Sequence, residues 1–332
     1  MRALVLEHPA PLASGEPLRH RDVPEPEPGA GDLVLRVGAC AVCRTDLQLV
    51  EGDLAAHRLP TIPGHQVVGR VEALGAGVTG WSVGERAAVG WLAGTCGTCR
   101  ACRDGRENLC TTARFTAWDR DGGFAERIVV AADVALRVPD LFTDVAAAPL
   151  LCGGVIGYRS LLVSGIRPGG RLGLYGFGAS ARLALQVARQ WGCEVHVATR
   201  SMPERERAAA AGASSVGGYD EPPPAPLDAA VTFAPAGAVV VAAVRALDRG
   251  GTVAVNAIHL DGIPAFAYES LWWERSLRSV ANYTRDDARR FLELAAEIPV
   301  HTEVELFALA DGVTALRRLG AGTLDGTAVL VP

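Results

Sequence analysis

The chain of 332 residues contains no lysine, and all 32 of its basic residues are arginine. Lysine chemistry is thereby excluded, because no ε-amino group is present to act as a catalytic base or to form a Schiff base. We attribute the bias itself to codon composition. Any catalytic role must fall to other residue types.

Long apolar runs and charge of one sign are also scarce. The N-terminus, MRALVLEHPAP, lacks the apolar core of a signal peptide, and we expect no apolar run long enough to cross a membrane. The net charge is −5, and both signs are dispersed along the chain, without the basic concentration typical of nucleic-acid or membrane binding. We therefore expect a cytoplasmic protein whose ligands are small molecules, with neither nucleic acid nor membrane as a partner.

Two halves of different pattern follow each other along the chain. Short β-rich runs separated by turns fill the first 150 residues or so, as in LVLRVGA (33–39) and VVGRVEALG (67–75). After Leu151, strands alternate with helices, which is typical of a doubly wound parallel sheet. We expect an α/β protein with an irregular, mostly β domain over residues 1–152 and a cofactor domain over 153–283. The segment over 284–332 could complete the parallel sheet, but we expect it to return to the first domain.

Four of the eight cysteines fall in one short segment, CGTCRACRDGRENLC, at Cys96, Cys99, Cys102 and Cys110. Four thiolates satisfy tetrahedral zinc, and Cys-x2-Cys steps wrap a turn around one ion. In the ferredoxin iron–sulfur run the fourth cysteine follows after three residues and precedes proline, whereas here seven residues intervene and threonine follows. Disulfides are rare in the cytoplasm. We predict a structural zinc in a lobe over about 91–112, closed to further ligands.

A second metal site is suggested by Cys43, His65 in PGHQVVG and Cys152 in PLLCGG. Cys/His/Cys is one of the three-ligand sets of catalytic zinc, with the fourth position left for water or substrate. Three scattered residues are a weak signal, because a lone cysteine is more often a small apolar residue. A lone histidine is more often a satisfied polar side chain, so the residues alone leave this question open.

The stretch LGLYGFGASARLALQVA fits Gly-x-Gly-x-x-Ala between a strand and a helix, which is typical of dinucleotide binding. Gly176 permits a tight turn, Gly178 lets the backbone approach a pyrophosphate, and Ala181 allows close packing of helix on strand. The turn and the first helical residues add Phe177, Ala179 and Ser180 as candidate cofactor contacts. The helix N-terminus favours the anion.

The residues that indicate the cofactor preference lie about 20 residues after the glycine turn, at the end of VHVATRS. An NAD-binding domain would usually place an acidic residue here to hold the ribose hydroxyls. This chain has Thr199, Arg200 and Ser201 instead. Nothing at these positions repels a 2′-phosphate, and arginine with two hydroxyl groups would bind one. We predict that NADP(H) is preferred over NAD(H); the alternative is that Arg200 only stacks on adenine.

Over nearly its whole length the chain resembles the zinc-containing medium-chain alcohol dehydrogenases. The motifs that carry the resemblance occur in order: Cys43-Arg44-Thr45-Asp46, Gly64-His65, Trp91 with the four-cysteine lobe, Cys152, Gly176-Phe177-Gly178 and the closing AVLVP. The resemblance implies a GroES-like catalytic domain and a Rossmann cofactor domain. It also implies that Cys43, His65 and Cys152 bind a catalytic zinc.

Further roles follow from the same resemblance. Thr45 would hydrogen-bond the substrate oxygen, Asp46 would orient the zinc-bound histidine, and Arg44 would reach the cofactor pyrophosphate. The implied reaction is hydride transfer between NADP(H) or NAD(H) and a small primary alcohol or aldehyde, with Trp91 walling the pocket. Phe115 and Trp118 either narrow that pocket or pack the lobe. Relatives are homodimers or homotetramers, and the apolar stretch 257–273 could supply such a surface.

Two positions depart from the family pattern. Gln66 stands where the family usually has glutamate, and Gln48 stands where many relatives have a histidine that passes the alcohol proton to solvent. Glutamine cannot change charge, so a proton path from Thr45 must use cofactor hydroxyls or water. We interpret both departures as tuning the activity of the zinc site. The alternatives are reduction of an activated C=C or C=N bond, or a catalytically silent cofactor-binding protein.

Overall fold

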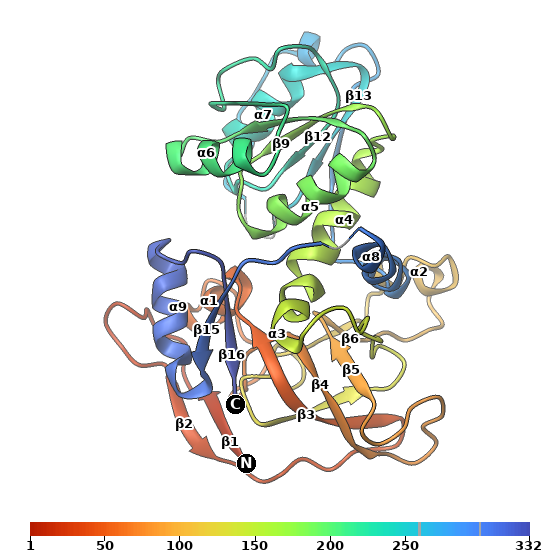
Figure 1. The fold of residues 1–332 in the computed structure, drawn as a ribbon, viewed down its shortest axis with the longest axis vertical. Coiled ribbons are helices and arrows are strands. Elements are labelled where there is room, and N and C mark those ends of the chain that lie inside the picture. Colours follow the sequence, from red (N-terminus) through yellow and green to blue (C-terminus); the bar gives the residue numbers. More distant parts are fainter. Residues whose placement is uncertain (258–259, 299) are drawn as a thin grey trace. The chain divides into compact units, whose positions relative to one another are not determined.

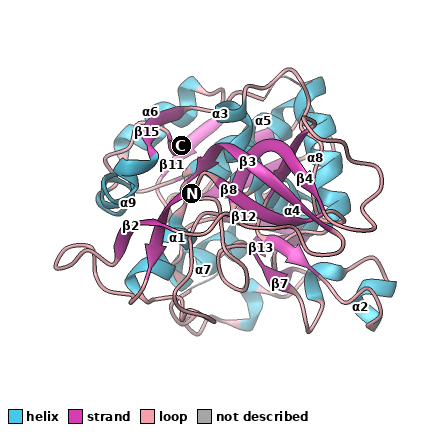
Figure 2. Ribbon diagram, turned by 90° about the horizontal axis from the view of Figure 1, so that it is seen from below, coloured by secondary structure: helices cyan, strands magenta, loops and turns pink. Residues whose placement is uncertain are grey.

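A computed structural model describes residues 1–257, 260–298 and 300–332, and in it the chain forms two compact units. The β-rich unit consists of Met1–Cys152, Thr284–Ala296 and His301–Pro332. The parallel-sheet unit consists of Gly153–Tyr283 and Glu297–Val300. Figure 1 shows both units, and Figure 2 shows their helices and strands by type. The predicted fold class, an irregular β domain and a doubly wound parallel sheet, is confirmed.

The β-rich unit is organised around one long strand, β3 (Asp32–Ala41). It pairs antiparallel with β4 (Gln66–Leu74) along one edge, and with β8 (Arg127–Ala131) and β16 (Thr327–Val331) along the other. The sheet is completed by β5 (Arg86–Val89) next to β4 and by β15 (Val304–Ala308) parallel to β16. Apolar residues fill nearly every position of β3, so this strand forms the centre of the core.

The remaining elements of the β-rich unit are short. A hairpin-like pair, β1 and β2, stands apart from the sheet, and β6 pairs with β7 beside the cysteine lobe. Their bounds, with those of the helices, are β1 Arg2–Leu6, β2 Leu18–Asp22, β6 Leu92–Gly94, β7 Arg114–Phe115, α1 Arg44–Glu51, α2 Arg100–Arg103, η1 Glu107–Leu109, α3 Asp144–Ala147, η2 Ala148–Leu151, α8 Arg285–Glu297, η4 Leu309–Asp311 and α9 Gly312–Ala321.

The parallel-sheet unit contains six strands in the order β11-β10-β9-β12-β13-β14, and every neighbouring pair is parallel. Counted along the chain this is the order 3-2-1-4-5-6 of doubly wound dinucleotide-binding domains. The strands are β9 Arg171–Tyr175, β10 Glu194–Ala198, β11 Ser215–Gly217, β12 Leu227–Thr232, β13 Leu247–Val255 and β14 Ser276–Ser279. The helices are α4 Gly153–Ser164, α5 Ala179–Gln190, α6 Met202–Ala210, α7 Gly237–Ala246 and the short η3 Tyr268–Ser270.

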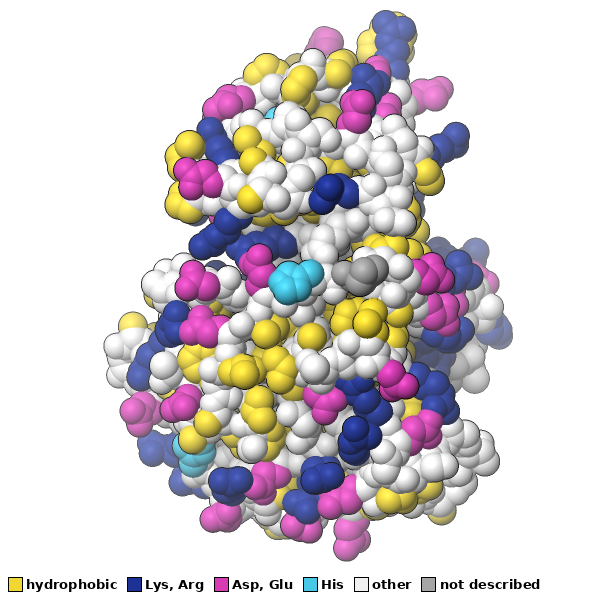
Figure 3. Space-filling model, viewed as in Figure 1, with side chains coloured by type: hydrophobic (Ala, Val, Ile, Leu, Met, Phe, Trp, Pro, Cys, Tyr) yellow, Lys and Arg dark blue, Asp and Glu magenta, His cyan; other side chains and the backbone are white. Residues whose placement is uncertain are grey.

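One helical stretch, Asp144–Ser164, is long and apolar enough by length and composition to cross a membrane, contrary to our expectation from the sequence. Its most apolar window has a mean hydropathy of 1.5, and 61% of that window is buried inside the protein. The core helix of a soluble protein meets the same description, so the stretch is weak evidence for a membrane span. Acidic and basic side chains are interspersed over the face shown in Figure 3, as the dispersed charge of the sequence predicts.

The turn before His65 can only be made by glycine. Gly64 has φ +92°, and a Cβ at this position would lie 2.4 Å from Phe124 Cδ1 and 2.8 Å from Cys40 Sγ. Both neighbours are fully buried, so neither can move aside cheaply. Gly77, in a surface turn of the same unit, has φ +78° but open space around it. Substitutions at Gly64 and at Gly77 can therefore be compared to separate the cost of left-handed backbone strain from the cost of crowding around a new Cβ.

We expect Gly64→Ala to lower the free energy of unfolding by about 3 kcal/mol, since left-handed backbone strain and overpacking add. Gly77→Ala, the matched control, should cost only about 1 kcal/mol because it introduces the strain alone. Urea unfolding of the two variants and the wild type measures both losses. Equal losses would contradict the crowding argument.

Candidate functional site

The carboxylate of Asp46 is the centre of the first cysteine–histidine cluster. It lies in the first turn of α1 and accepts hydrogen bonds from the backbone N–H groups of Cys43 at 2.9 Å and Gly64 at 3.2 Å. It also binds His65 Nδ1 at 3.0 Å, and both side chains are 1% exposed. A carboxylate on Nδ1 fixes the imidazole tautomer and leaves Nε2 free to bind a metal.

Cys43, His65 and Cys152 converge, as the sequence suggested. Their ligand atoms all lie within 4.8 Å of one another, and Cys43 Sγ is 3.4 Å from His65 Nε2. The pKa of the Cys43 thiol lies well below its usual value, because Cys152 donates a hydrogen bond to it and His65 lies beside it. The same hydrogen bond, together with burial, raises the pKa of Cys152. Two sulfurs and one imidazole nitrogen in this arrangement fit a zinc ion.

Gln66 is bonded in a way that a glutamate could not reproduce. Its side chain is 2% exposed, and its amide Nε2 donates to the backbone carbonyl of Ala41, its cross-strand partner, at 3.3 Å. A carboxylate here would face that carbonyl with no proton to donate. The amide therefore satisfies the backbone of β3 and adds no negative charge to the cluster.

Thr45 and Gln48 occupy α1 beside the cluster. Thr45 is 8% exposed, and its backbone N–H hydrogen-bonds the sulfur of Cys43 and helps to lower the pKa of that thiol. Gln48 is half-buried one turn further along. Arg44, the first residue of the helix, is exposed. Cys43 is thus the N-cap of α1, and Thr45 and Gln48 follow it within the helix.

An aromatic cluster adjoins His65. Trp91 contacts the imidazole edge-on with 5.0 Å between centroids, and it stacks with Phe115 at 5.3 Å and with Trp118 at 5.8 Å. Trp118 is in turn stacked at 3.7 Å on His57. The structure thus joins the three aromatic residues of the sequence analysis into one wall. The contribution of His57 was missed, since nothing in its sequence context sets it apart.

Two polar contacts hold the part of the aromatic wall that contains His57 and Trp118. His57 Nδ1 contacts Asp119 Oδ1 at 2.7 Å, and the indole N–H of Trp118 donates to the carbonyl of Ala55 at 2.7 Å. The segments around residues 55–57 and 115–119 are therefore tied together, and the rings on them have fixed orientations. The rings of Trp91, Phe115 and Trp118 thus form one continuous aromatic surface next to His65.

The four cysteines of the lobe also converge, with all four sulfurs within 4.8 Å of one another. Sγ–Sγ distances are 3.5 Å for Cys99–Cys102, 3.6 Å for Cys96–Cys110 and 3.9 Å for Cys96–Cys102. Four thiolates bound at 2.3 Å around a tetrahedral ion would lie about 3.8 Å apart. Hydrogen bonds from the backbone N–H groups of Thr98 and Cys99 lower the pKa of Cys96 to about 5. The set fits structural zinc.

The lobe is anchored by one carboxylate. Glu107, 7% exposed, accepts hydrogen bonds from the backbone N–H and the Nε of Arg285, at 2.9 Å and 3.4 Å. These contacts join η1 to the start of α8. They hold the pKa of Glu107 below its usual value although burial opposes this. The lobe is thereby fixed to the segment that follows the parallel-sheet unit in sequence.

The glycine turn in the parallel-sheet unit is as tight as the motif predicts. Gly176 has φ +95°, and a Cβ there would lie 2.9 Å from the backbone nitrogen of Ala234. Gly178 is the N-cap of α5, and a Cβ there would meet nothing within 4 Å. Phe177 and Ala181 are buried, whereas Ala179 and Ser180 are the first two residues of the helix. The turn leaves open space in front of a helix N-terminus, where an anion binds favourably.

The residue after β10 contacts a carboxylate of α6 that the sequence analysis did not consider. Thr199 is fully buried, and its hydroxyl donates to Glu204 Oε2 at 2.5 Å. Ser201 caps α6 by accepting from the backbone N–H of Glu204, while Arg200 is exposed. A carboxylate five residues further along, in the first turn of α6, thus contacts the residue that follows β10. Its distance in sequence explains why the motif did not reveal it.

Known proteins resemble this chain over almost all of its length. A model of the alcohol dehydrogenase GroES-like domain matches residues 29–140. A probable alcohol dehydrogenase AdhA of Mycobacterium tuberculosis is 46% identical over 337 residues, covering 100% of this chain and 97% of the relative. Two solved structures superpose closely, a cinnamyl alcohol dehydrogenase of Sorghum bicolor and a cobalt- and zinc-bound thermostable alcohol dehydrogenase of Pyrobaculum aerophilum. Their TM-scores are 0.90 and 0.89, their identities 26% and 27%, and the matches cover 99% and 100% of this chain and 97% and 99% of theirs.

Proposed function

Because the chain belongs to the zinc-containing medium-chain alcohol dehydrogenases, we propose that it interconverts a slim primary alcohol and its aldehyde with zinc and NADP(H). The convergence of Cys43, His65 and Cys152 around one point is the observation that carries the proposal. The zinc-bound relative from Pyrobaculum aerophilum supports the choice of metal. Zinc at this set would supply a Lewis acid for the substrate oxygen, and the nicotinamide would exchange the hydride.

The residues of α1 and the turn before β4 prepare the cluster for that chemistry. Asp46 keeps the proton of His65 on Nδ1 and holds the ring in place, so that Nε2 faces the sulfur of Cys43. The lowered pKa of Cys43 keeps that ligand in the thiolate form that a metal requires. The Thr45 hydroxyl would accept the hydrogen bond of an alcohol and pass on a proton, and the onward path would use water or cofactor hydroxyls because Gln48 cannot change charge.

Substrate shape follows from the aromatic wall. Trp91, with 8% of its surface exposed, lies directly beside His65, and Phe115 and Trp118 continue the apolar surface. We propose that this surface selects slim, flat alcohols and aldehydes. The cinnamyl alcohol dehydrogenase among the solved relatives is named for a substrate of that shape.

Metal content tests the zinc proposal. The wild type should hold about two zinc ions per chain, because both cysteine sets bind one. Cys43→Ser should lower the content to about one and abolish aldehyde reduction, because one ligand of the proposed catalytic site is lost. Cys99→Ser should also lower the content to about one, with its main effect on thermal stability. Cys193→Ser, which changes a buried thiol outside both sets, should keep about two and full turnover.

Atomic absorption and NADPH oxidation with a panel of aldehydes and enals provide the two measurements. A wild-type content of one zinc that Cys43→Ser leaves unchanged would contradict the catalytic site. Turnover of enals but not of aldehydes would replace alcohol dehydrogenation by C=C reduction on the same scaffold.

The preference for NADP(H) is the second part of the proposal. Arg200 and the Ser201 hydroxyl lie at the N-terminus of α6, where a 2′-phosphate would meet a guanidinium and backbone N–H groups. The Glu204 carboxylate opposes a phosphate at this strand end, but its Oε2 accepts the Thr199 hydroxyl. We propose that Arg200 and Ser201 bind the phosphate directly and that Thr199 acts by holding Glu204.

Cofactor titrations test this arrangement. Arg200→Gln should weaken NADPH binding about 10- to 100-fold and leave NADH binding nearly unchanged, since one charged hydrogen bond is lost. Glu204→Gln should tighten NADPH binding, because the amide oxygen still accepts from Thr199 but the negative charge is gone. Arg245→Gln, on the exposed face of α7, is the control. Fluorescence quenching measures the affinities, and equal wild-type affinities for both cofactors would refute the preference.

We also propose that the protein forms a homodimer or homotetramer in the cytoplasm. The stretch 257–273 includes Ile258 and His259, which lie outside the described residues; within the rest, Tyr268, Trp272 and Trp273 are 49–65% exposed. The edge strand β14 follows them in sequence. An exposed aromatic group beside an open strand edge is a surface that association would cover. Light scattering should show an oligomer for the wild type and a smaller species for Trp272→Glu; a monomeric wild type would contradict the proposal.

A further inference from the structure

Four arginines form one row across the main sheet of the β-rich unit. In the register of the sheet, Arg36 of β3 is the direct cross-strand partner of Arg127 on β8 and of Arg70 on β4, and Arg70 is the partner of Arg86 on β5. Like charges placed directly opposite each other on neighbouring strands are destabilising. A row of four therefore needs compensating negative charge.

Among the residues that the structure describes, carboxylates pair with the arginines at the two ends of the row. Arg127 forms ion pairs with Glu72 at 2.7 Å and with Glu25 at 3.2 Å. At the other end, Arg86 Nε lies 2.7 Å from Asp144 Oδ1. The outer guanidinium groups are thus neutralised within the fold.

The two central arginines lack such partners. Within residues 1–257, 260–298 and 300–332, no carboxylate lies within ion-pair distance of Arg36 or Arg70. The one hydrogen bond of Arg70 runs from NH1 to the carbonyl of Gly84 at 3.3 Å. Arg36 is exposed in the middle of a strand whose neighbouring positions are buried, and Arg70 is the exposed residue at the corresponding place in β4. Most of their N–H groups remain available to an external acceptor.

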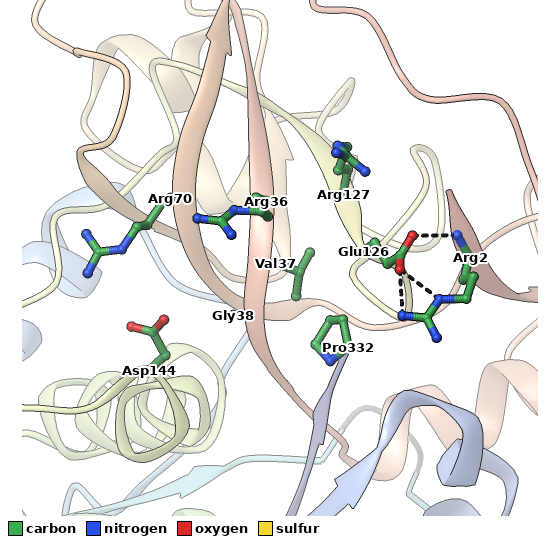
Figure 4. A pocket seen from close by; sticks show the side chains of 9 residues that line it. All are labelled: Arg2, Arg36, Val37, Gly38, Arg70, Glu126, Arg127, Asp144 and Pro332. Atoms are coloured by element: carbon green, nitrogen blue, oxygen red, sulfur yellow. Dashed lines mark hydrogen bonds and ion pairs between the residues drawn. The ribbon is translucent and has the colours of Figure 1, made fainter.

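A cavity of about 460 Å³ lies at this row. Figure 4 shows Arg36 and Arg70 projecting from adjacent strands on the same side, with Asp144 below them, and Arg2 and Glu126 bonded to each other at the opposite side of the view. Three arginines of the row and the additional Arg2 line it together with two acidic residues, Glu126 and Asp144. The arginine at the far end of the row, Arg86, lies outside the lining. Asp144 and Glu126 are each bonded to an arginine, so neither is free to neutralise the central pair.

We propose that this cavity, here called the arginine-row pocket, binds a small ligand with two or more oxyanion groups, such as a diphosphate or a polycarboxylate. Planar guanidinium groups bind phosphate and carboxylate oxygens through paired N–H donors. The volume suits a small molecule and exceeds what one inorganic phosphate fills. The acidic residues on its rim disfavour a long polyanion such as nucleic acid. The lining shares no residue with either cysteine set or with the glycine turn.

Calorimetric titration with inorganic pyrophosphate and with citrate tests the proposal. Saturating NADPH is present throughout so that cofactor phosphate subsites are filled, and sodium chloride of equal ionic strength replaces the probe in a parallel series. We expect saturable binding of at least one probe to the wild type. The double variant Arg36→Gln/Arg70→Gln should bind at least tenfold more weakly, whereas Arg289→Gln, an exposed arginine of α8 outside the row, should bind like the wild type.

The probes also distinguish the ligand class, since tighter binding of pyrophosphate indicates a phosphorylated ligand and tighter binding of citrate a carboxylic acid. Thermal unfolding adds a second readout. The double variant should be at least as stable as the wild type at low salt without probe, because the repulsion is relieved, and should lose the rise in melting temperature that the probe causes. Three results would overturn the proposal. The first is equal probe binding by the double variant and the wild type. The second is an equal rise in melting temperature with sodium chloride alone. The third is a wild type that binds neither probe while the double variant changes its oligomeric state.

Discussion

The carboxylate of Asp46 is the constraint on which the Cys43, His65 and Cys152 cluster depends, because it receives three hydrogen bonds from two parts of the chain. Two come from backbone N–H groups at Cys43 and Gly64, and the third comes from His65. One side chain therefore defines the start of α1, the turn before β4 and the orientation of an imidazole ring. Burying such a charge is costly unless its lone pairs are satisfied, and here three donors satisfy them. Gly64 allows the turn before β4 to come close enough to the Asp46 carboxylate to donate its backbone N–H.

The two cysteine sets bring thiols together in opposite surroundings. The cluster at His65 is buried and depends on Asp46 and on the hydrogen bond between two thiols. The lobe is largely exposed at Cys96, and its thiolates are favoured by nearby backbone N–H groups. With zinc bound as proposed, the buried set of three would leave a position for substrate, whereas the set of four would close around its ion and stabilise a loop. The difference in ligand number thus matches the difference in surroundings.

Local patterns in the sequence predicted more of this structure than long-range ones. The lobe spacing and the glycine turn were readable because their residues are neighbours in the chain, and the alternation of strands and helices indicated the parallel sheet. Cys43, His65 and Cys152 lie far apart, so only the family resemblance joined them. The hydrogen bond of Gln66 to Ala41 and the arginine row depend on the register of β3, which shifts between Val34 and Leu35 and again between Val37 and Ala39. Such irregularities leave no clear trace in the residue pattern.

The pairing of β16 with β3 has a consequence for biosynthesis. Cys40 and Ala41 of β3 pair with Leu330 and Val329, which are translated long after them. A ribosome therefore releases the whole of Gly153–Tyr283 before the sheet of the β-rich unit can be completed. The parallel-sheet unit is nearly continuous and can fold while translation proceeds, since domains fold as units. The edge of β3 stays open meanwhile, so the sheet of the β-rich unit is completed only after the parallel-sheet unit has been synthesised.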